Sequence, residues 1–154
     1  MKKYLLLFTG VCFIMAGCSK NKIFEKYNKL DGYTWKKDNV IKFEVDIQDI
    51  SVPYNIRLVI RHTSYYVYAN IRVRITTTYP SGEQRHNEHN IFVRNTDGTF
   101  NGEGAGDLWD VFYNVSDKIT FPVQGIYVFE IQNVMPLVAT PNIMDVGLIV
   151  KKSR

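Results

Sequence analysis

Three stretches of this chain alternate apolar and polar residues with a period of two. In residues 41–47, isoleucine, phenylalanine and valine at the odd positions alternate with charged residues at the even ones. Because successive side chains of a strand point to opposite faces of a sheet, this pattern predicts a half-buried β-strand. Residues 56–61 and 71–75 repeat it, and we expect the arginines at their polar positions to share one face that meets solvent or a partner: Arg57, Arg61, Arg72 and Arg74.

Turn residues and further strands complete an all-β pattern. Residues 80–83 read Pro-Ser-Gly-Glu and predict a tight turn, with a return strand over residues 89–94. Residues 125–133 and 146–150 are the strongest strands of the C-terminal part, and Asp107 is placed to cap a short helix over residues 108–113. Seven to eight short strands with regularly spaced turns predict an antiparallel β-sandwich of jelly-roll or immunoglobulin-like type.

The first eighteen residues have the form of a bacterial lipoprotein signal. Lys2 and Lys3 precede an apolar run that ends in Met15-Ala16-Gly17-Cys18. The run holds about a dozen residues, whereas a membrane-spanning helix needs about 20. We therefore expect cleavage before Cys18 and acylation of Cys18, which would fix the protein to a membrane. The expected organisation is a signal peptide over 1–17, a tether over 18–38 and a single β-sandwich domain over 39–154.

Charge and cysteine content narrow the classes of partner. The full chain carries 19 basic and 15 acidic residues. Loss of residues 1–17 would remove two lysines and no acid, so the remaining chain would be almost neutral and nucleic acid is not expected as a partner. Cys12 lies in the signal, which leaves Cys18 as the one cysteine after cleavage and excludes a disulfide within the domain.

No pattern in the sequence predicts an enzyme, a cofactor or a metal ion. His86, Glu88 and His89 are metal-ligand types, but the two histidines are three apart beside a turn rather than four apart on a helix. Residues 97–108 fit the start of a calcium loop, yet Leu108 stands where a closing glutamate is needed. Neither a nucleophile elbow nor a cysteine nucleophile is present, so we expect a protein without catalytic activity.

Two loops are the remaining candidates for a site. The first is glycine-rich, and we interpret it as structural: Gly102, Gly104 and Gly106, with Asp107 and Asp110 hydrogen-bonding it shut. The second is aromatic, and its composition suits a protein interface and packing under the sandwich rim equally well: Tyr65, Tyr66, Tyr68 and the following Asn70. The arginine face beside it favours binding.

Four segments of the chain resemble the gliding-motility GldH lipoprotein family of Bacteroidetes. They are Ile60-Arg61-His62 with Tyr68 and Asn70, residues 102–107, residues 125–129 leading to Gln132, and residues 145–148. The resemblance implies a lipid-anchored, non-enzymatic component of the envelope machinery for gliding and its linked secretion system. Surface-exported lipoproteins of such bacteria usually carry acidic residues after the cysteine, and here Ser19-Lys20-Asn21-Lys22 follows it. We therefore expect the periplasmic face, with the outer membrane favoured over the inner.

Two functions remain open at this point. In the first, the acylated chain is a scaffold that offers its arginines and tyrosine loop to another envelope protein. In the second, it binds a carbohydrate or another small ligand that stacks on Trp109 near the glycine loop. A cleft containing Trp109 would favour the second function, whereas a filled rim would favour the first.

Overall fold

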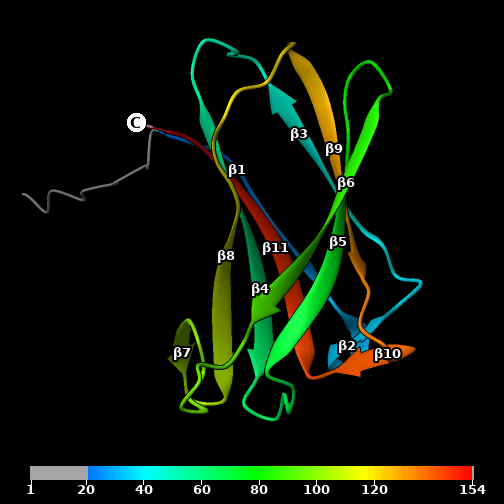
Figure 1. Ribbon diagram of the computed structural model, residues 1–154, viewed down its shortest axis with the longest axis vertical. Helices are drawn as coiled ribbons and strands as arrows, with labels where there is room; N and C mark the ends of the chain where they lie inside the picture. The colour runs from blue at the N-terminus through cyan, green and yellow to red at the C-terminus, as the bar shows by residue number, and fades with distance from the viewer. Residues whose placement is uncertain (1–20, 154) are drawn as a thin grey trace, which may run out of the picture.

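The computed structural model describes residues 21–153, which form two antiparallel sheets packed face to face (Figure 1). The predicted all-β sandwich is confirmed. Sheet A has the strand order β1-β11-β4-β8-β7, and sheet C has the order β3-β9-β5-β6. A small third sheet, sheet B, consists of β10 and β2. The elements are β1 Lys22–Lys29, η1 Asp31–Tyr33, β2 Thr34–Lys36, β3 Ile41–Ile47, β4 Tyr54–Thr63, β5 Asn70–Thr78, β6 Gln84–Phe92, β7 Glu103–Ala105, β8 Leu108–Ile119, β9 Gly125–Asn133, β10 Ala139–Pro141 and β11 Ile143–Lys152.

The period-two pattern explains how the core forms. Strand β3 alternates strictly between buried and exposed residues along its whole length. Its apolar side meets the inward side chains of β4, β5 and β9, and together they make one core between the sheets. Each fully buried aliphatic or aromatic side chain in such a core contributes roughly 1.5–3 kcal/mol. Within residues 21–153 no helix is long and apolar enough to cross a membrane.

The segment predicted as a tether belongs to the sandwich from residue 22 onward. Strand β1 pairs with β11 from Lys22 to Lys29, and the Trp35 side chain is completely buried, its indole N–H donating to the Asn39 carbonyl at 2.9 Å. The tether prediction is therefore wrong for residues 22–36. Its polar composition reflects an edge strand, where charged side chains discourage pairing with other chains. The signal peptide and Cys18 lie outside the described residues and stay predictions.

Two further predicted elements differ from the structure. Residues 108–113 form the start of strand β8 rather than a helix, because they pair with β4 along their whole length and residues 108–110 also close a hairpin with β7. Asp107 sits in the turn of that hairpin, where its side chain accepts a hydrogen bond from the Ser64 hydroxyl at 3.0 Å instead of capping a helix. The hairpin at residues 80–83 is confirmed, but its return strand, β6, covers 84–92 rather than 89–94.

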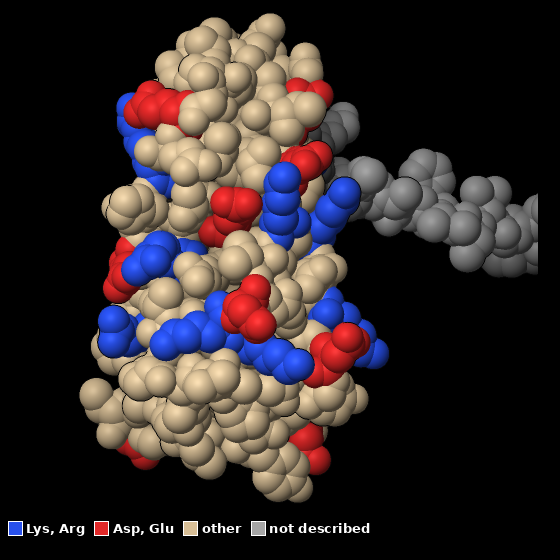
Figure 2. All heavy atoms as spheres, turned by 90° about the vertical axis from the view of Figure 1, so that its right-hand side faces the viewer, with Lys and Arg blue, Asp and Glu red and all other residues tan. Residues whose placement is uncertain are grey.

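The four arginines lie on two faces, contrary to the prediction of one. Arg57 and Arg61 belong to β4 in sheet A, and Arg72 and Arg74 belong to β5 in sheet C. Because the apolar side of each strand faces the shared core, the arginines point out from opposite sides of the sandwich. Figure 2 shows the side on which β5 and β6 lie in Figure 1, with charged side chains gathered across its middle and few at either end.

Candidate interaction surface

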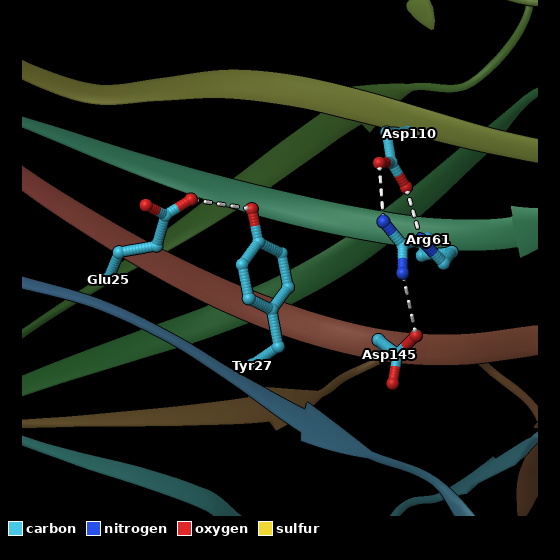
Figure 3. A network of polar contacts seen from close by, with 5 residues as sticks. All are labelled: Glu25, Tyr27, Arg61, Asp110 and Asp145. Atoms are coloured by element: carbon cyan, nitrogen blue, oxygen red, sulfur yellow. Dashed lines mark hydrogen bonds and ion pairs between the residues drawn. The ribbon is translucent and has the colours of Figure 1, made fainter. Parts of the chain in front are cut away.

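The outer face of sheet A carries a charged cluster centred on Arg61. In the register of the sheet, Arg61 stands opposite Asp110 of β8 on one side and Asp145 of β11 on the other. Its guanidinium donates to both oxygens of Asp110, from Nε at 2.7 Å and from Nη2 at 2.8 Å, and it reaches Asp145 at 3.5 Å (Figure 3). These bonds raise the pKa of Arg61 above its ordinary value, with Asp110 as the main cause. The cluster is a rigid, charge-assisted link across three strands.

Tyr27 of β1 extends the cluster toward the edge of the sheet. The Arg61 guanidinium carbon lies 5.8 Å from the centre of the Tyr27 ring, within the range of a cation–π contact. The Tyr27 hydroxyl donates to Glu25 at 3.2 Å (Figure 3). Glu25 is in turn paired with Lys22. Burial, followed by the charge of Glu25, raises the pKa of the Tyr27 hydroxyl, so the phenol stays protonated at neutral pH.

The lack of a side chain at Gly147 leaves room for the Tyr27 ring. A Cβ atom on Gly147 would come within 2.5 Å of Tyr27 Cδ1, a distance that real Cβ contacts do not show. The glycine of the 145–148 segment is thus explained by the ring that lies across it. Sequence reasoning picked out residues 145–148 but did not find Tyr27, because no local pattern tells which strand lies beside β11.

Apolar side chains lie beneath the polar groups of this face. Val59 and Ile149 occupy outward positions in β4 and β11, yet they are only 0% and 6% exposed. Arg57 covers part of the same face, with its guanidinium carbon 5.9 Å from the centre of the Phe112 ring and its Nε donating to the Asn114 side chain at 3.0 Å. On the outer face of sheet A, arginines and aromatic rings therefore cover a strip of apolar side chains. This composition is common in protein interfaces.

The glycine-rich loop forms the β7–β8 hairpin beside the cluster. A Cβ on Gly102 would collide with the Asp110 carbonyl, and one on Gly104 with the Trp109 ring, while Gly106 adopts a positive φ of 60° in the turn. The structural interpretation of these glycines is thus supported by geometry. Asp110, however, bonds Arg61 and does not close the loop.

A cleft of about 450 Å³ opens beside the hairpin, and Trp109 is not among its lining residues. Arg61, Asp110, Leu108 and the β7 strand line it. The Trp109 ring lies on the other side of the hairpin, against Gly104 and against Phe100 at a centroid distance of 5.1 Å. Stacking of a sugar on Trp109 therefore has no support in this geometry.

The tyrosine loop divides into packed and exposed residues. Tyr66 is completely buried, and its hydroxyl donates to the Asn70 carbonyl at 2.8 Å; burial raises the pKa of that hydroxyl well above its ordinary value. Tyr68 packs partly against the core. Tyr65 and Val67, in contrast, are 69% and 74% exposed at the tip of the loop. Packing thus explains Tyr66, while the tip remains free for an interface.

The loop tip lies near the Arg61 cluster. Asn142, just before β11, donates to the Tyr65 carbonyl at 3.1 Å, and the Ser64 N–H donates to the Asp107 carbonyl in the β7–β8 turn at 2.8 Å. The structure therefore brings together Arg61, Asp110, the glycine hairpin and the loop tip at one end of sheet A. We call this group the distal surface, defined by Arg61, Tyr65, Val67, Leu108 and Asp110.

Arg72, Arg74 and Asn70 lie apart from the distal surface, on sheet C. The two arginines share Glu88 of β6, at 3.5 Å and 2.7 Å, and all three side chains are more than 40% exposed. The arginines lower the pKa of the Glu88 carboxyl. Asn70 bonds the Asn90 side chain. These residues cannot join Arg61 in a single flat interface.

The histidines do not form a metal site. His86 and His89 stand on strand β6, and their spacing of three puts them on opposite faces of it. No group of three His, Cys, Asp or Glu side chains that could hold a metal occurs within residues 21–153. His62 is completely buried at the end of β4, with Nδ1 2.8 Å from the Thr63 carbonyl and Nε2 without a partner. Burial lowers the pKa of His62.

Comparisons with known proteins agree on one family. The sequence model of the GldH lipoprotein family matches residues 22–150. The chain is 24% identical over 157 aligned positions to the gliding motility lipoprotein GldH homolog of Christiangramia forsetii, covering 97% of this chain and 94% of that protein. It is 27% identical over 95 positions to the gliding motility lipoprotein GldH of Flavobacterium johnsoniae, covering 62% of this chain and 59% of that protein.

Proposed function

Since this chain belongs to the GldH lipoprotein family, we propose that it acts in the cell envelope as a lipid-anchored scaffold that binds another envelope protein through its distal surface. Membership implies a lipoprotein held in the envelope and no known enzymatic activity. The partner contact, the acylation of Cys18 and the periplasmic face of the outer membrane are parts of the proposal. The observation that carries it is the exposed pair Tyr65 and Val67 beside the rigid Arg61 cluster.

The position of the anchor relative to the distal surface supports this proposal. Strand β1 begins at Lys22, four residues after Cys18, and four extended residues reach about 14 Å at most. Lys22 pairs with Lys151, whereas the tyrosine loop contacts the opposite end of β11. In Figure 1, β1 starts beside the C-terminus at the upper left and the β4–β5 loop lies at the bottom. The eight residues of β1 add about 26 Å along the strand direction.

An anchored chain of this shape keeps the end at which β1 begins near the bilayer. The distal surface, at the other end, is then presented to other proteins. Tyrosine and arginine are enriched among the residues that contribute most to binding when a partner excludes water from them, and the exposed Val67 and Leu108 add apolar surface beside Tyr65 and Arg61. The bonds that hold Arg61 reduce the entropy that it would lose on binding. A rigid charged group beside an apolar tip therefore favours a protein partner.

Crosslinking in living cells tests the proposed interface. The tagged full-length chain is crosslinked, purified and analysed by mass spectrometry, alongside a Tyr65→Ser/Val67→Ser double variant. We expect the double variant to lose at least about tenfold of a specific crosslinked envelope protein, because two apolar anchors are removed. Arg74→Glu on sheet C is the matched control and should retain the crosslink. Equal recovery by the wild type and the double variant would refute the distal surface as the interface.

Mass spectrometry of the mature amino terminus tests the anchor separately. We expect the chain purified from its host to begin at Cys18 and to carry fatty acyl groups on that residue. Fractionation of inner and outer membranes should place the protein in the outer one. An unmodified Cys18, or a retained leader, would contradict the anchored part of the proposal and leave the interface to be judged by the crosslinking result.

A further inference from the structure

A second cleft, of about 210 Å³, opens between the two sheets at the edge formed by β6 and β8. Strand β7 pairs only with Leu108, Trp109 and Asp110, so within residues 21–153 the rest of β8 has no neighbour on that side. On the other sheet, β6 is also an edge strand. The register between β4 and β8 shifts around Val115, a bulge that bends β8 beside the cleft.

The floor of this inter-sheet cleft consists of core side chains. Ile56, Ile75, Phe121 and Phe129 line it, although each is no more than 5% exposed to solvent. The cleft therefore reaches into the hydrophobic core instead of lying on the surface. A molecule in it would bury apolar atoms against residues that are already fixed by packing, at little cost in ordering the protein.

The mouth of the inter-sheet cleft is polar because three polar side chains of β6 lie on the inner face of their sheet. Arg85, Asn87 and His89 stand opposite Thr77, Ile75 and Val73 in the register of β5 and β6, and residues directly opposite share a face of the sheet. These polar side chains of β6 thus point inward, on the same face as buried valine and isoleucine. They and Ser116 of β8 surround the opening.

The charge of the lining favours an anionic ligand, with Glu83 next to the cleft offsetting part of the charge of Arg85. Arg85 is the one cationic side chain lining the inter-sheet cleft, and no carboxylate lines it. The Nε of Arg85 donates to Glu83 at 2.7 Å, and its guanidinium lies 4.9 Å from the centre of the Tyr79 ring, so the group is held near the mouth. His89 contacts the Tyr113 hydroxyl at 3.3 Å, and burial lowers the pKa of its imidazole.

From this arrangement we propose that the inter-sheet cleft binds a small amphipathic acid, with its aliphatic tail on the apolar floor and its carboxylate at Arg85 and Asn87. The cleft has the volume of about seven water molecules at ~30 Å³ each. A tail of six to eight carbon atoms therefore fits, while a full-length lipid chain would leave most of its atoms outside. The site lies on β6 and β8, away from the distal surface, and does not depend on the proposed partner.

Photolabelling of the full-length chain in its own membranes tests this proposal. The probe is an eight-carbon carboxylic acid with a diazirine in its tail, and an amine with the same tail is the matched control. After illumination and digestion, we expect the acid probe to label peptides from residues 84–89 and 113–121. An excess of octanoate should reduce this labelling at least about tenfold, and an excess of octylamine should leave it unchanged.

Two variants separate binding by this cleft from general attraction to apolar surface. Arg85→Gln should lower labelling by the acid about five- to tenfold and leave labelling by the amine unchanged, because only the carboxylate needs the cation. Ser116→Phe should fill the mouth and abolish labelling, with circular dichroism to check its fold. Arg57→Gln, on the outer face of sheet A, should behave as the wild type.

Other outcomes would overturn the proposal. Equal labelling by acid and amine probes would show that the polar residues of β6 serve to protect the edge strand from pairing and do not recognise a carboxylate. Labelling concentrated on residues 65–68 or 135–138 would show that the probe binds at another apolar surface and not in the inter-sheet cleft. Loss of octanoate competition in the wild type would mean that no saturable site exists.

Discussion

The outer faces of the two sheets carry similar arginines and hold them in very different ways. On sheet A, Arg61 makes two short bonds to Asp110, and the acidic side chains around it are only 22% and 15% exposed. On sheet C, Arg72 and Arg74 share the single carboxylate of Glu88, and the three side chains are 49%, 41% and 45% exposed. The comparison shows that an Ile-Arg alternation in a strand does not specify the environment of the arginine, because that depends on the strands beside it.

The largest expected difference between the faces concerns the glycine under Tyr27. Gly147→Val places a branched side chain where the Tyr27 ring lies, so we expect a loss of about 1–3 kcal/mol in the free energy of unfolding. Urea denaturation measures it. Thr76→Val on the outer face of sheet C should stay within about 0.5 kcal/mol. A Tyr27→Ala/Gly147→Val double variant should recover much of the loss; an unchanged loss would rule out the ring contact as its cause.

Removal of the central arginine should come next in size. Arg61→Met leaves Asp110 and Asp145 without their cation, and both are partly shielded from water. We expect the free energy of unfolding to fall by about 1–2 kcal/mol, because the arginine is partly exposed and solvent screens part of its interaction with the two carboxylates. Chemical denaturation at low salt measures it. A loss as small as that of an exposed ion pair would mean that the Arg61 cluster is not rigid.

A pH-dependent loss of stability should separate the buried end of β4 from the exposed face of β6. Burial lowers the pKa of His62 in the folded state below the ordinary value of about 6.5. The unfolded chain then binds more protons, so the contribution of His62 is complete above about pH 6.5 and declines as the pH falls below it. His62→Phe should weaken the dependence of unfolding free energy on pH between 7.5 and 5. His86→Phe, on the exposed face of β6, should keep it; an equal slope in both variants would contradict this assignment.

The smallest effect is expected for the arginines of sheet C. Arg74→Gln removes one exposed pair with Glu88, and such pairs contribute about 0–1 kcal/mol. We expect a change of less than about 0.5 kcal/mol that disappears in high salt, as measured by urea denaturation at two ionic strengths. A larger, salt-independent loss would show that the two faces are more alike than their exposures indicate.

Local sequence patterns were sufficient for the strands that face both core and solvent. Strand β9 covers residues 125–133 as predicted, and β3 and β5 follow their alternation, because a period of two is imposed on any strand with one buried face. Residues 22–29 and 108–113 are strands that the sequence does not predict, because neither shows a clear alternation of apolar and polar residues. The first is an edge strand without a buried residue, and the second is held by pairing with β4, and at residues 108–110 also with β7, rather than by its own propensity.

The all-β class, the alternation of the core and the candidate residues Arg61, Tyr65 and Gly104 can be read from the chain, because each follows from local periodicity or residue chemistry. The grouping of Arg61 with Tyr27 and Asp145, the separation of Arg72 and Arg74 onto the opposite face, and the inward position of Arg85 cannot. These depend on strand order and register, which join residues as distant in the chain as Lys22 and Lys151. Pairing between distant strands is set by how the whole core packs, and no short window of sequence contains that information.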